Sequence, residues 1–150
     1  MSESSRIRVM IVDDHDVLRS GLRFSLLAFK DLDVVCEARD GQEAVRLCGE
    51  CQPDVVLMDM LMPEMDGIKA TQAIRRRYPQ VRVLALSSFY DQDLVRRALQ
   101  AGATGYLVKG TSAAKLVEAI HAVHAGQTVL APEARQATSQ DVDSIGPKTG

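Results

Sequence analysis

The sequence predicts one α/β domain, built as a doubly wound sheet of five parallel strands with helices on both faces. Two observations predict this fold: the alternation of two kinds of segment along the chain, and the chain's length and composition. Five short aliphatic runs alternate with five segments whose apolar residues recur at helical spacing. Such an alternation is typical of parallel strands joined by right-handed helical crossovers. The length of 150 residues and the hydrophobic share of 46% suit one compact domain with a sizeable core.

The strands and helices can be placed in order from the residues at their ends. Five aliphatic runs between turn residues are predicted as strands: residues 7–12, 33–38, 55–58, 81–87 and 106–108. Each helix is predicted to start at a residue that favours an N-cap or a turn: Asp16, Asp40, Asp66, Asp91 and either Thr111 or Ser112. The strand at 55–58 lies between Pro53 and Pro63 and is predicted to be fully buried.

Apolar residues at helical spacing predict the inner faces of the helices. These residues are Leu18, Leu22, Leu26 and Phe29 in the first helix, Val95, Ala98 and Leu99 in the fourth, and Leu116, Ile120 and Val123 in the fifth. In the second helix Ala44, Cys48 and Cys51 would share the apolar face. We therefore interpret the Cys48-to-Cys51 pair as packing residues, because a zinc or redox site needs further ligands or a thioredoxin-like setting.

Composition argues against several classes of function. A net charge of −2 does not favour nucleic-acid binding by this chain alone, since phosphate backbones need a basic surface. The first residues are polar and acidic, unlike a signal peptide, and no apolar run reaches the roughly 18 residues of a spanning helix. We expect a cytoplasmic protein that does not contact a membrane.

The regular pattern ends near residue 126. We expect residues 1–126 to form the domain and residues 127–150 to form an extension. Residues 128–132 could still pack on the domain, whereas the chain from about residue 137 is polar and is expected to be a flexible tail or linker.

Polar side chains lie at the ends of four predicted strands. Asp13 and Asp14 follow the first strand, Asp59 follows the third, Ser87 ends the fourth and Lys109 follows the fifth. The carboxyl ends of parallel strands meet at one edge of the sheet, where open sheets bind ligands, so these side chains should form one site. Three carboxylates repel one another unless a cation joins them, and Mg²⁺ suits such oxygen ligands.

A metal ion, a lysine and a hydroxyl around one aspartate suit phosphoryl transfer. The cations neutralise charge on the transferring oxygens, and catalysis is mostly positioning and electrostatics. A carboxylate such as Asp59 can act as the nucleophile and form an aspartyl phosphate. The combination of acids, a hydroxyl and a lysine on successive strand ends is a more specific signal than any one of these residues alone.

These motifs resemble those of the receiver domain of bacterial two-component response regulators. Asp13 and Asp14 match its acid pair, Asp59 its phosphoacceptor and Lys109 its phosphate-binding lysine. The resemblance implies the flavodoxin-like strand order 2-1-3-4-5 and phosphoryl transfer to Asp59 from a sensor histidine kinase. It also implies Mg²⁺ held by the side chains of Asp14 and Asp59 and by the backbone carbonyl of Leu61, with Asp13 acting through water.

Two further positions match the switch residues of that family. Ser87 matches the switch hydroxyl, and Tyr106 matches the aromatic position. Ser87 could swing to bind a phosphoryl oxygen, and the space it leaves could then admit Tyr106. The alternative is that Tyr106 simply packs on the sheet edge. We expect a signalling switch rather than an enzyme, forming a homodimer when it is phosphorylated.

Finer motifs resemble the NarL/LuxR-type regulators, in which a receiver precedes a helix-turn-helix DNA-binding domain. These motifs are Asp13-Asp14-His15, residues 103–109 and residues 126–132. The DNA-binding domain is absent from these 150 residues, so DNA contact and transcriptional control are expected only through it. The chain is then either a receiver from a longer regulator, which we favour, or a stand-alone receiver that acts through protein contacts.

Two positions depart from the family pattern. Gly110 stands where many receivers have proline, and a cis Lys109–Gly110 peptide would cost about 3 kcal/mol, so both geometries stay open. Leu61 stands where asparagine is frequent. Leu61 and Phe89, each two residues past a site residue, offer no hydrogen bond to an attacking water, which predicts slow autodephosphorylation.

One different class of protein has a similar motif. Asp14-His15-Asp16-Val17 superficially matches the nucleophile motif of haloacid-dehalogenase-type phosphatases, with Asp14 as the nucleophile. Those enzymes need later acidic pairs and usually a cap domain, for which this chain has little room.

Overall fold

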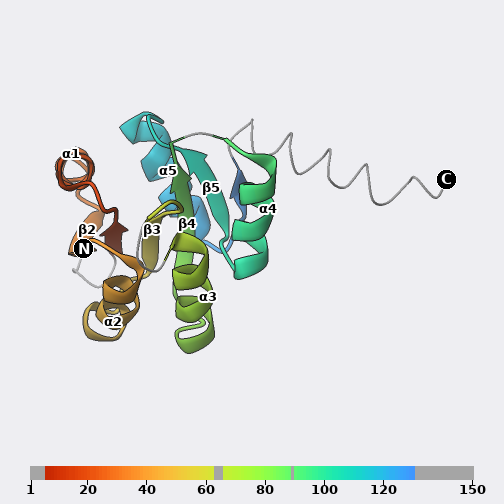
Figure 1. The fold of residues 1–150 in the computed structure, drawn as a ribbon. Coiled ribbons are helices and arrows are strands. Elements are labelled where there is room, and N and C mark those ends of the chain that lie inside the picture. Colours follow the sequence, from red (N-terminus) through yellow and green to blue (C-terminus); the bar gives the residue numbers. More distant parts are fainter. Residues whose placement is uncertain (1–5, 63–65, 89, 131–150) are drawn as a thin grey trace.

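The computed structural model describes residues 6–62, 66–88 and 90–130, which form a central sheet between two layers of helices (Figure 1). In chain order the elements are β1 (Ile7–Val12), α1 (Asp16–Leu26), β2 (Leu32–Ala38), α2 (Gly41–Cys51), β3 (Val55–Asp59), α3 (Gly67–Arg77), β4 (Arg82–Ser87), α4 (Gln92–Ala101), β5 (Gly105–Val108), α5 (Ala113–His124) and β6 (Val129–Leu130). All five predicted strands are present, with bounds close to those predicted.

The described sheet is parallel throughout and has the order β2-β1-β3-β4-β5-β6. Its first five strands follow the predicted order 2-1-3-4-5. The prediction of five strands was one too few, because β6 pairs with β5 through Gly105 with Val129 and Tyr106 with Leu130. The sheet therefore continues past residue 126, where the extension was predicted to begin.

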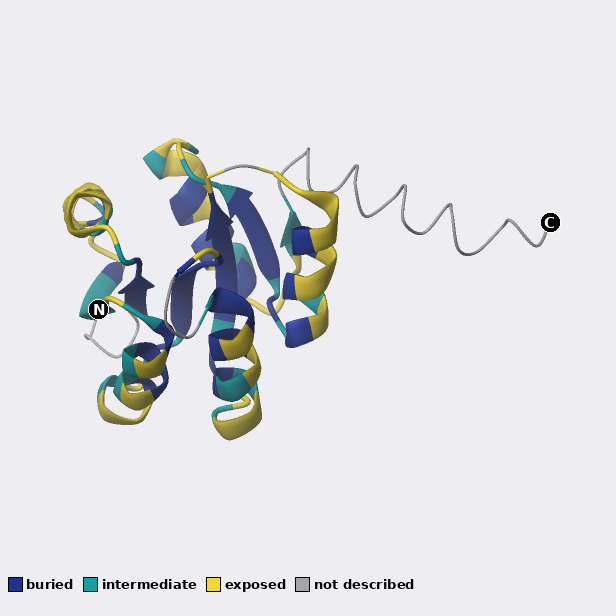
Figure 2. Ribbon diagram, viewed as in Figure 1, coloured by how far each residue is buried: buried dark blue, intermediate teal, exposed yellow. Residues whose placement is uncertain are grey.

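Helices cover both faces of this sheet, as predicted. Helix α1 contacts α5, and on the other face α3 contacts both α2 and α4 (Figure 1). Figure 2 shows that the strands are mostly buried and that the helices expose their outer sides. The predicted inner-face residues that are buried in α4 and α5 are Val95, Ala98, Leu116, Ile120 and Val123. In the described ranges no helix has both the length and the apolar character to cross a membrane.

The start of α1 differs from its prediction. Asp16 is the first helical residue, and His15 occupies the N-cap position without a side-chain cap. The physical reason is that Asp13 closes this turn itself, because its Oδ1 accepts the His15 N–H at 2.8 Å. Leu26 is buried as expected, but Leu18 is exposed.

Side-chain caps confirm the other predicted helix starts. Asp40, Asp66 and Asp91 each accept the backbone N–H of the residue three positions later. At α5 the cap is Ser112, while the Thr111 hydroxyl donates to the Val108 carbonyl at 2.8 Å.

The cysteines are free thiols that pack between β2 and α2. Cys48 is buried, and Cys36 and Cys51 are half-buried. Burial, together with the nearby Cys51, raises the pKa of Cys48 to about 12. A thiol with such a pKa is neutral at physiological pH, which agrees with the packing interpretation.

Candidate functional site

The carboxyl ends of β1, β3 and β5 bring two carboxylates and one ammonium into contact. Lys109 Nζ lies 2.8 Å from Asp13 Oδ2 and 3.2 Å from Asp59 Oδ2. Asp13 is 5% exposed and Asp59 is 2% exposed. The strand order creates this cluster, because β3 lies between β1 and β4, and β5 is the next strand along. Two buried carboxylates therefore share one cation.

Backbone contacts fix the position of Asp59 at the end of β3. Its Oδ1 accepts the Leu61 N–H at 3.1 Å, and the Met60 N–H donates to the Leu86 carbonyl of β4 at 3.0 Å. Helix α3 begins directly beside this segment. A Cβ at Gly67 would lie 2.6 Å from the Met60 Cα and would collide with the Asp59 carbonyl oxygen, so glycine permits this close approach.

The two charged partners have shifted pKa values. Burial raises the pKa of Asp59, the Leu61 N–H and Lys109 oppose this rise, and Asp13 adds to it. Burial lowers the pKa of Lys109, but Asp13 and Asp59 outweigh that effect and raise it overall. Lys109 is thus held in its charged form, while the charge of Asp59 is only partly compensated.

Asp14 brings a further oxygen to this edge of the sheet. Its Oδ1 is buried and lies 3.3 Å from His15 Nδ1, yet it accepts no well-formed hydrogen bond within the described residues. One ligand atom each from Asp13, Asp14, His15 and Asp59 lies within 4.8 Å of the others. A buried carboxylate oxygen without a well-formed hydrogen bond is costly, and a divalent cation would satisfy it. These residues therefore fit a hard, oxygen-ligated ion.

Ser87 and Tyr106 lie deeper, and both are fully buried. The Ser87 carbonyl accepts the Lys109 N–H at 2.6 Å, which joins the ends of β4 and β5. Burial raises the pKa of the Tyr106 hydroxyl, and Ser87 is close enough to lower it in part. That hydroxyl makes no well-formed hydrogen bond in the described part of the chain.

The position of Tyr106 bears on the predicted switch. The ring already occupies the interior, which is the end point of the predicted inward movement. The alternative was that Tyr106 simply packs on the edge of the sheet. This alternative has to be restated, because β6 pairs with the outer side of β5. A coupled movement of Ser87 and Tyr106 stays a prediction. From this conformation, the movement would start with the Tyr106 ring already in the interior of the domain.

The structure answers part of what the sequence left open at Gly110 and Leu61, the two positions that depart from the family pattern. No cis peptide occurs among the described residues, so the Lys109–Gly110 bond is trans, and Gly110 has a φ of 96° that favours glycine. The Leu61 side chain is exposed, next to Asp59. Phe89, its predicted partner in slowing hydrolysis, lies outside the described residues.

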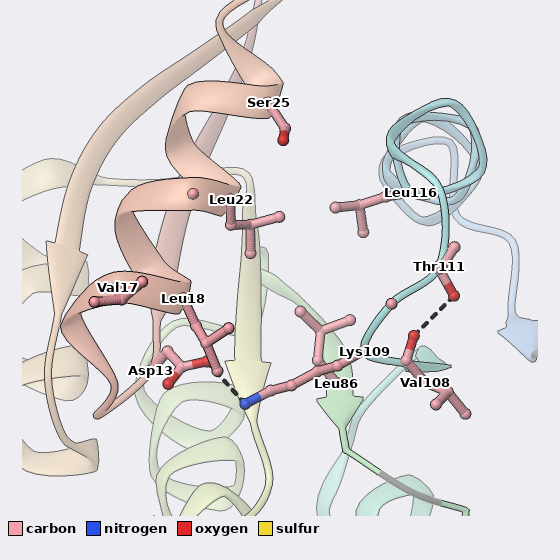
Figure 3. A pocket seen from close by; sticks show the side chains of 12 residues that line it. Asp13, Val17, Leu18, Leu22, Ser25, Leu86, Val108, Lys109, Thr111 and Leu116 are labelled. Carbon is pink, nitrogen blue, oxygen red and sulfur yellow. Dashed lines mark hydrogen bonds and ion pairs between the residues drawn. The ribbon is translucent and has the colours of Figure 1, made fainter.

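A cavity of about 470 Å³ lies next to the acid cluster, between α1 and the segment that joins β5 to α5 (Figure 3). Its wall is mostly apolar, with Leu18 and Leu22 on one side and Leu116 on the other. The ion pair of Asp13 and Lys109 borders this cavity (Figure 3).

The predicted strand-end residues thus gather at one edge of the sheet. Asp13, Asp14, Asp59 and Lys109 form one cluster, and the backbone of Ser87 joins it to β4. Sequence reasoning missed Arg19, which contacts the loop that carries the acid pair. A basic residue one turn into the helix that follows strand-end acids is the signal that could have revealed it.

Comparisons with known proteins agree with this geometry. Residues 9–121 match the family described as the response regulator receiver domain. Transcriptional regulatory protein LnrK of Bacillus subtilis is 45% identical over 127 residues, and LiaR of the same organism is 45% identical over 124 residues. The alignments cover 85% and 83% of this chain but 58% and 59% of those proteins, so the chain spans about three-fifths of their length.

Solved structures give the same result. A two-component response regulator of the LuxR family from Aurantimonas sp. SI85-9A1 has a TM-score of 0.86 and 37% identity, covering 91% of this chain and 98% of that one. The receiver domain of the putative response regulator NarL from Mycobacterium tuberculosis has a TM-score of 0.79 and 36% identity, covering 82% and 99%. The chain therefore belongs to the receiver-domain family of two-component response regulators, and within it to the NarL/LuxR type.

Proposed function

We propose that this domain is a phosphoaspartate switch in which Asp59 accepts a phosphoryl group from the phosphohistidine of a sensor histidine kinase. The observation that carries this proposal is the charge of the site. Asp13 and Asp59 share Lys109, and within the described residues the adjacent Asp14 Oδ1 has only a 3.3 Å contact with His15 Nδ1 and no well-formed hydrogen bond. Lys109 alone does not balance these carboxylates. A bound divalent cation would supply the missing positive charge, which would also stabilise the oxygens of a transferring phosphoryl group.

The transfer would run as a displacement at phosphorus. A carboxylate oxygen of Asp59 attacks, the phosphorus–nitrogen bond of the phosphohistidine breaks, and the departing imidazole keeps its electron pair and is protonated by solvent. Lys109 and the Ser87 hydroxyl would bind phosphoryl oxygens. Mg²⁺, held by Asp14, Asp59 and the Leu61 carbonyl with Asp13 acting through water, would supply charge to the phosphoryl oxygens when bound.

The kinase must approach Asp59 from the rim of the site. Helix α1 borders this rim, and its Val17 is 83% exposed although it is apolar. The neighbouring cavity adds an apolar surface between α1 and α5. These features support α1 as part of the surface that a kinase contacts.

The output would follow from Ser87 and Tyr106. Their rearrangement would change the surface of α4, β5 and α5 and favour a homodimer. LnrK and LiaR are named transcriptional regulatory proteins, which supports control of transcription through a helix-turn-helix domain joined after residues 127–150. We assign residues 1–126 to the receiver, whose sheet is extended by β6 from the segment that follows. We expect it to act in the cytoplasm, and we class it as a switch with slow autodephosphorylation rather than an enzyme.

The test is the identity of the phosphorylated residue. Incubation with acetyl phosphate or a phosphorylated histidine kinase should add one phosphoryl group to the wild type, measured by intact mass. Asp59→Asn should abolish this addition, and Asp14→Asn should make it depend on much higher Mg²⁺. Persistent labelling of Asp59→Asn, with loss only in Asp14→Asn, would favour the phosphatase class instead. The reading frame beyond residue 150 distinguishes a multidomain regulator from a stand-alone receiver.

A further inference from the structure

We propose that Arg19 is a positioning residue that holds the acidic loop at residues 13–16 and thereby sets the affinity of the site for its divalent cation. This inference rests on the metal site proposed above. It concerns a residue that does not itself contact the cation or the phosphoryl group.

The Arg19 side chain joins three parts of the molecule. Its Nη1 donates to the Asp13 carbonyl at 2.7 Å, and its Nη2 donates to Asp16 Oδ1 at 2.7 Å. Its Nε donates to Glu37 Oε1 on β2 at 3.1 Å. The guanidinium therefore connects the loop, the first turn of α1 and the neighbouring strand.

This arrangement differs from an ordinary surface ion pair. The Arg19 side chain is only 12% exposed, whereas exposed pairs contribute little. Burial lowers the pKa of Arg19, but Asp16 and Glu37 outweigh it and raise the pKa. A planar guanidinium can donate in three fixed directions at once, and a lysine ammonium cannot reproduce that geometry.

The Asp13 carbonyl is the link between Arg19 and the site. The side chain of the same residue accepts the His15 N–H and meets Lys109, and Asp14 follows directly in the loop. The Asp13 N–H donates to the Ala38 carbonyl at 3.1 Å, so the loop has a second anchor on β2. Without Arg19, repulsion between the acids could turn the Asp14 carboxylate away from Asp59.

The charge of Arg19 is not what the site uses. Asp16 and Glu37 both pair with it, and Glu37 also pairs with Arg23, so these two acids and two arginines balance one another in charge. Its effect on the cation should therefore come from the position of the loop. Residues that orient metal ligands in this way typically change metal affinity by about 10–100-fold when they are removed.

Arg23 provides a matched control. It lies one turn farther along α1, and its Nε contacts Glu37 Oε2 at 3.2 Å, the other oxygen of the same carboxylate. Its side chain is 51% exposed. Replacement of Arg23 removes an arginine–Glu37 pair from the same helix without removing the donor to the Asp13 carbonyl.

The experiment measures Mg²⁺ binding by calorimetry, and thermal unfolding confirms that each variant is folded. Arg19→Ala should weaken binding about tenfold, Arg19→Lys should recover part of that loss, and Arg23→Ala should stay within about twofold of the wild type. Glu37→Gln, which weakens the anchor of Arg19, should give a smaller loss and carries the test if Arg19→Ala does not fold.

Two outcomes would overturn the inference. Unchanged Mg²⁺ affinity in folded Arg19→Ala, or an equal loss in Arg23→Ala, would show that Arg19 does not position the loop. Asp14→Asn separates this failure from failure of the metal site. If the wild type binds Mg²⁺ and Asp14→Asn does not, the site stands and only the role of Arg19 is at issue. If the wild type itself binds no Mg²⁺, both proposals fail.

Discussion

Asp54 directly precedes strand β3 and Asp59 ends it, and the surroundings of these two carboxylates differ. At the amino end, Asp54 Oδ2 accepts the Arg8 N–H at 2.9 Å, and the Asp54 N–H donates to the Arg8 carbonyl at 2.7 Å. The Arg8 side chain donates to the carbonyls of Gln52 and Cys51 at 3.2 and 2.5 Å. Here the protein supplies hydrogen-bond partners for these polar groups from its own residues.

The carboxyl end lacks this balance. Asp59 is more deeply buried than Asp54, and it shares Lys109 with Asp13. Among the described residues the nearby Asp14 Oδ1 makes no well-formed hydrogen bond. Buried polar groups normally have partners, so the Asp14 oxygen without a well-formed hydrogen bond marks where a ligand would complete the cluster. This difference supports a structural role for Asp54 and the proposed chemical role for Asp59.

The largest expected difference between the two ends is in phosphoryl transfer. Lys109→Met removes the cation shared by the two carboxylates and should slow transfer to Asp59 on the order of 100-fold, as expected for loss of one charge-stabilising donor. Arg8→Met, at the other end, should leave the rate within about twofold. Rates of phosphorylation by acetyl phosphate measure both. A comparable loss in folded Arg8→Met would remove the distinction between the ends.

A smaller effect is expected on hydrolysis of the aspartyl phosphate. Leu61→Asn places an amide beside Asp59 that can orient a water, so decay of the phosphorylated protein should be severalfold faster than in the wild type. Asp54→Asn, at the opposite end of the strand, should leave the decay unchanged. Equal or slower decay in Leu61→Asn would contradict the role assigned to this side chain.

The smallest effect, on stability, should have opposite signs at the two ends. Without Mg²⁺, Asp59→Asn removes a poorly compensated charge and should raise the free energy of unfolding by about 1 kcal/mol. Asp54→Ala leaves the Arg8 N–H without its acceptor and should lower it by about 1 kcal/mol. Urea unfolding at neutral pH measures both changes, and the same sign for both variants would count against the comparison.

The effect of Asp59→Asn on stability should depend on pH. Burial raises the pKa of Asp59 in the folded protein above its ordinary 3.8, so its protonated form favours folding. That contribution is fully present below 3.8 and is lost as the pH rises through the higher folded pKa. The stability advantage of Asp59→Asn should therefore grow from acidic to neutral pH. An advantage that shrinks over this range would contradict the pKa direction.

Much of this site follows from local sequence patterns. Asp13, Asp59 and Lys109 could be placed together because aliphatic runs mark the strands and parallel strands end at one edge. The features that could not be predicted depend on contacts between distant segments. Arg19 finds Glu37 on another element, and Asp13 replaces Asp16 in closing the turn before α1. Strand β6, only Val129–Leu130, exists through its pairing with β5.

That short sixth strand has a mechanical consequence. Leu130 pairs in register with Tyr106, so the end of the described chain is attached to the strand that carries the proposed aromatic switch residue. A displacement of β5 would therefore also move Leu130. Whatever is joined beyond residue 130 would then change its position or freedom of movement without any new contact to the phosphorylated site. In this fold a signal can be passed on by a change in the position at which the following chain is attached to the sheet.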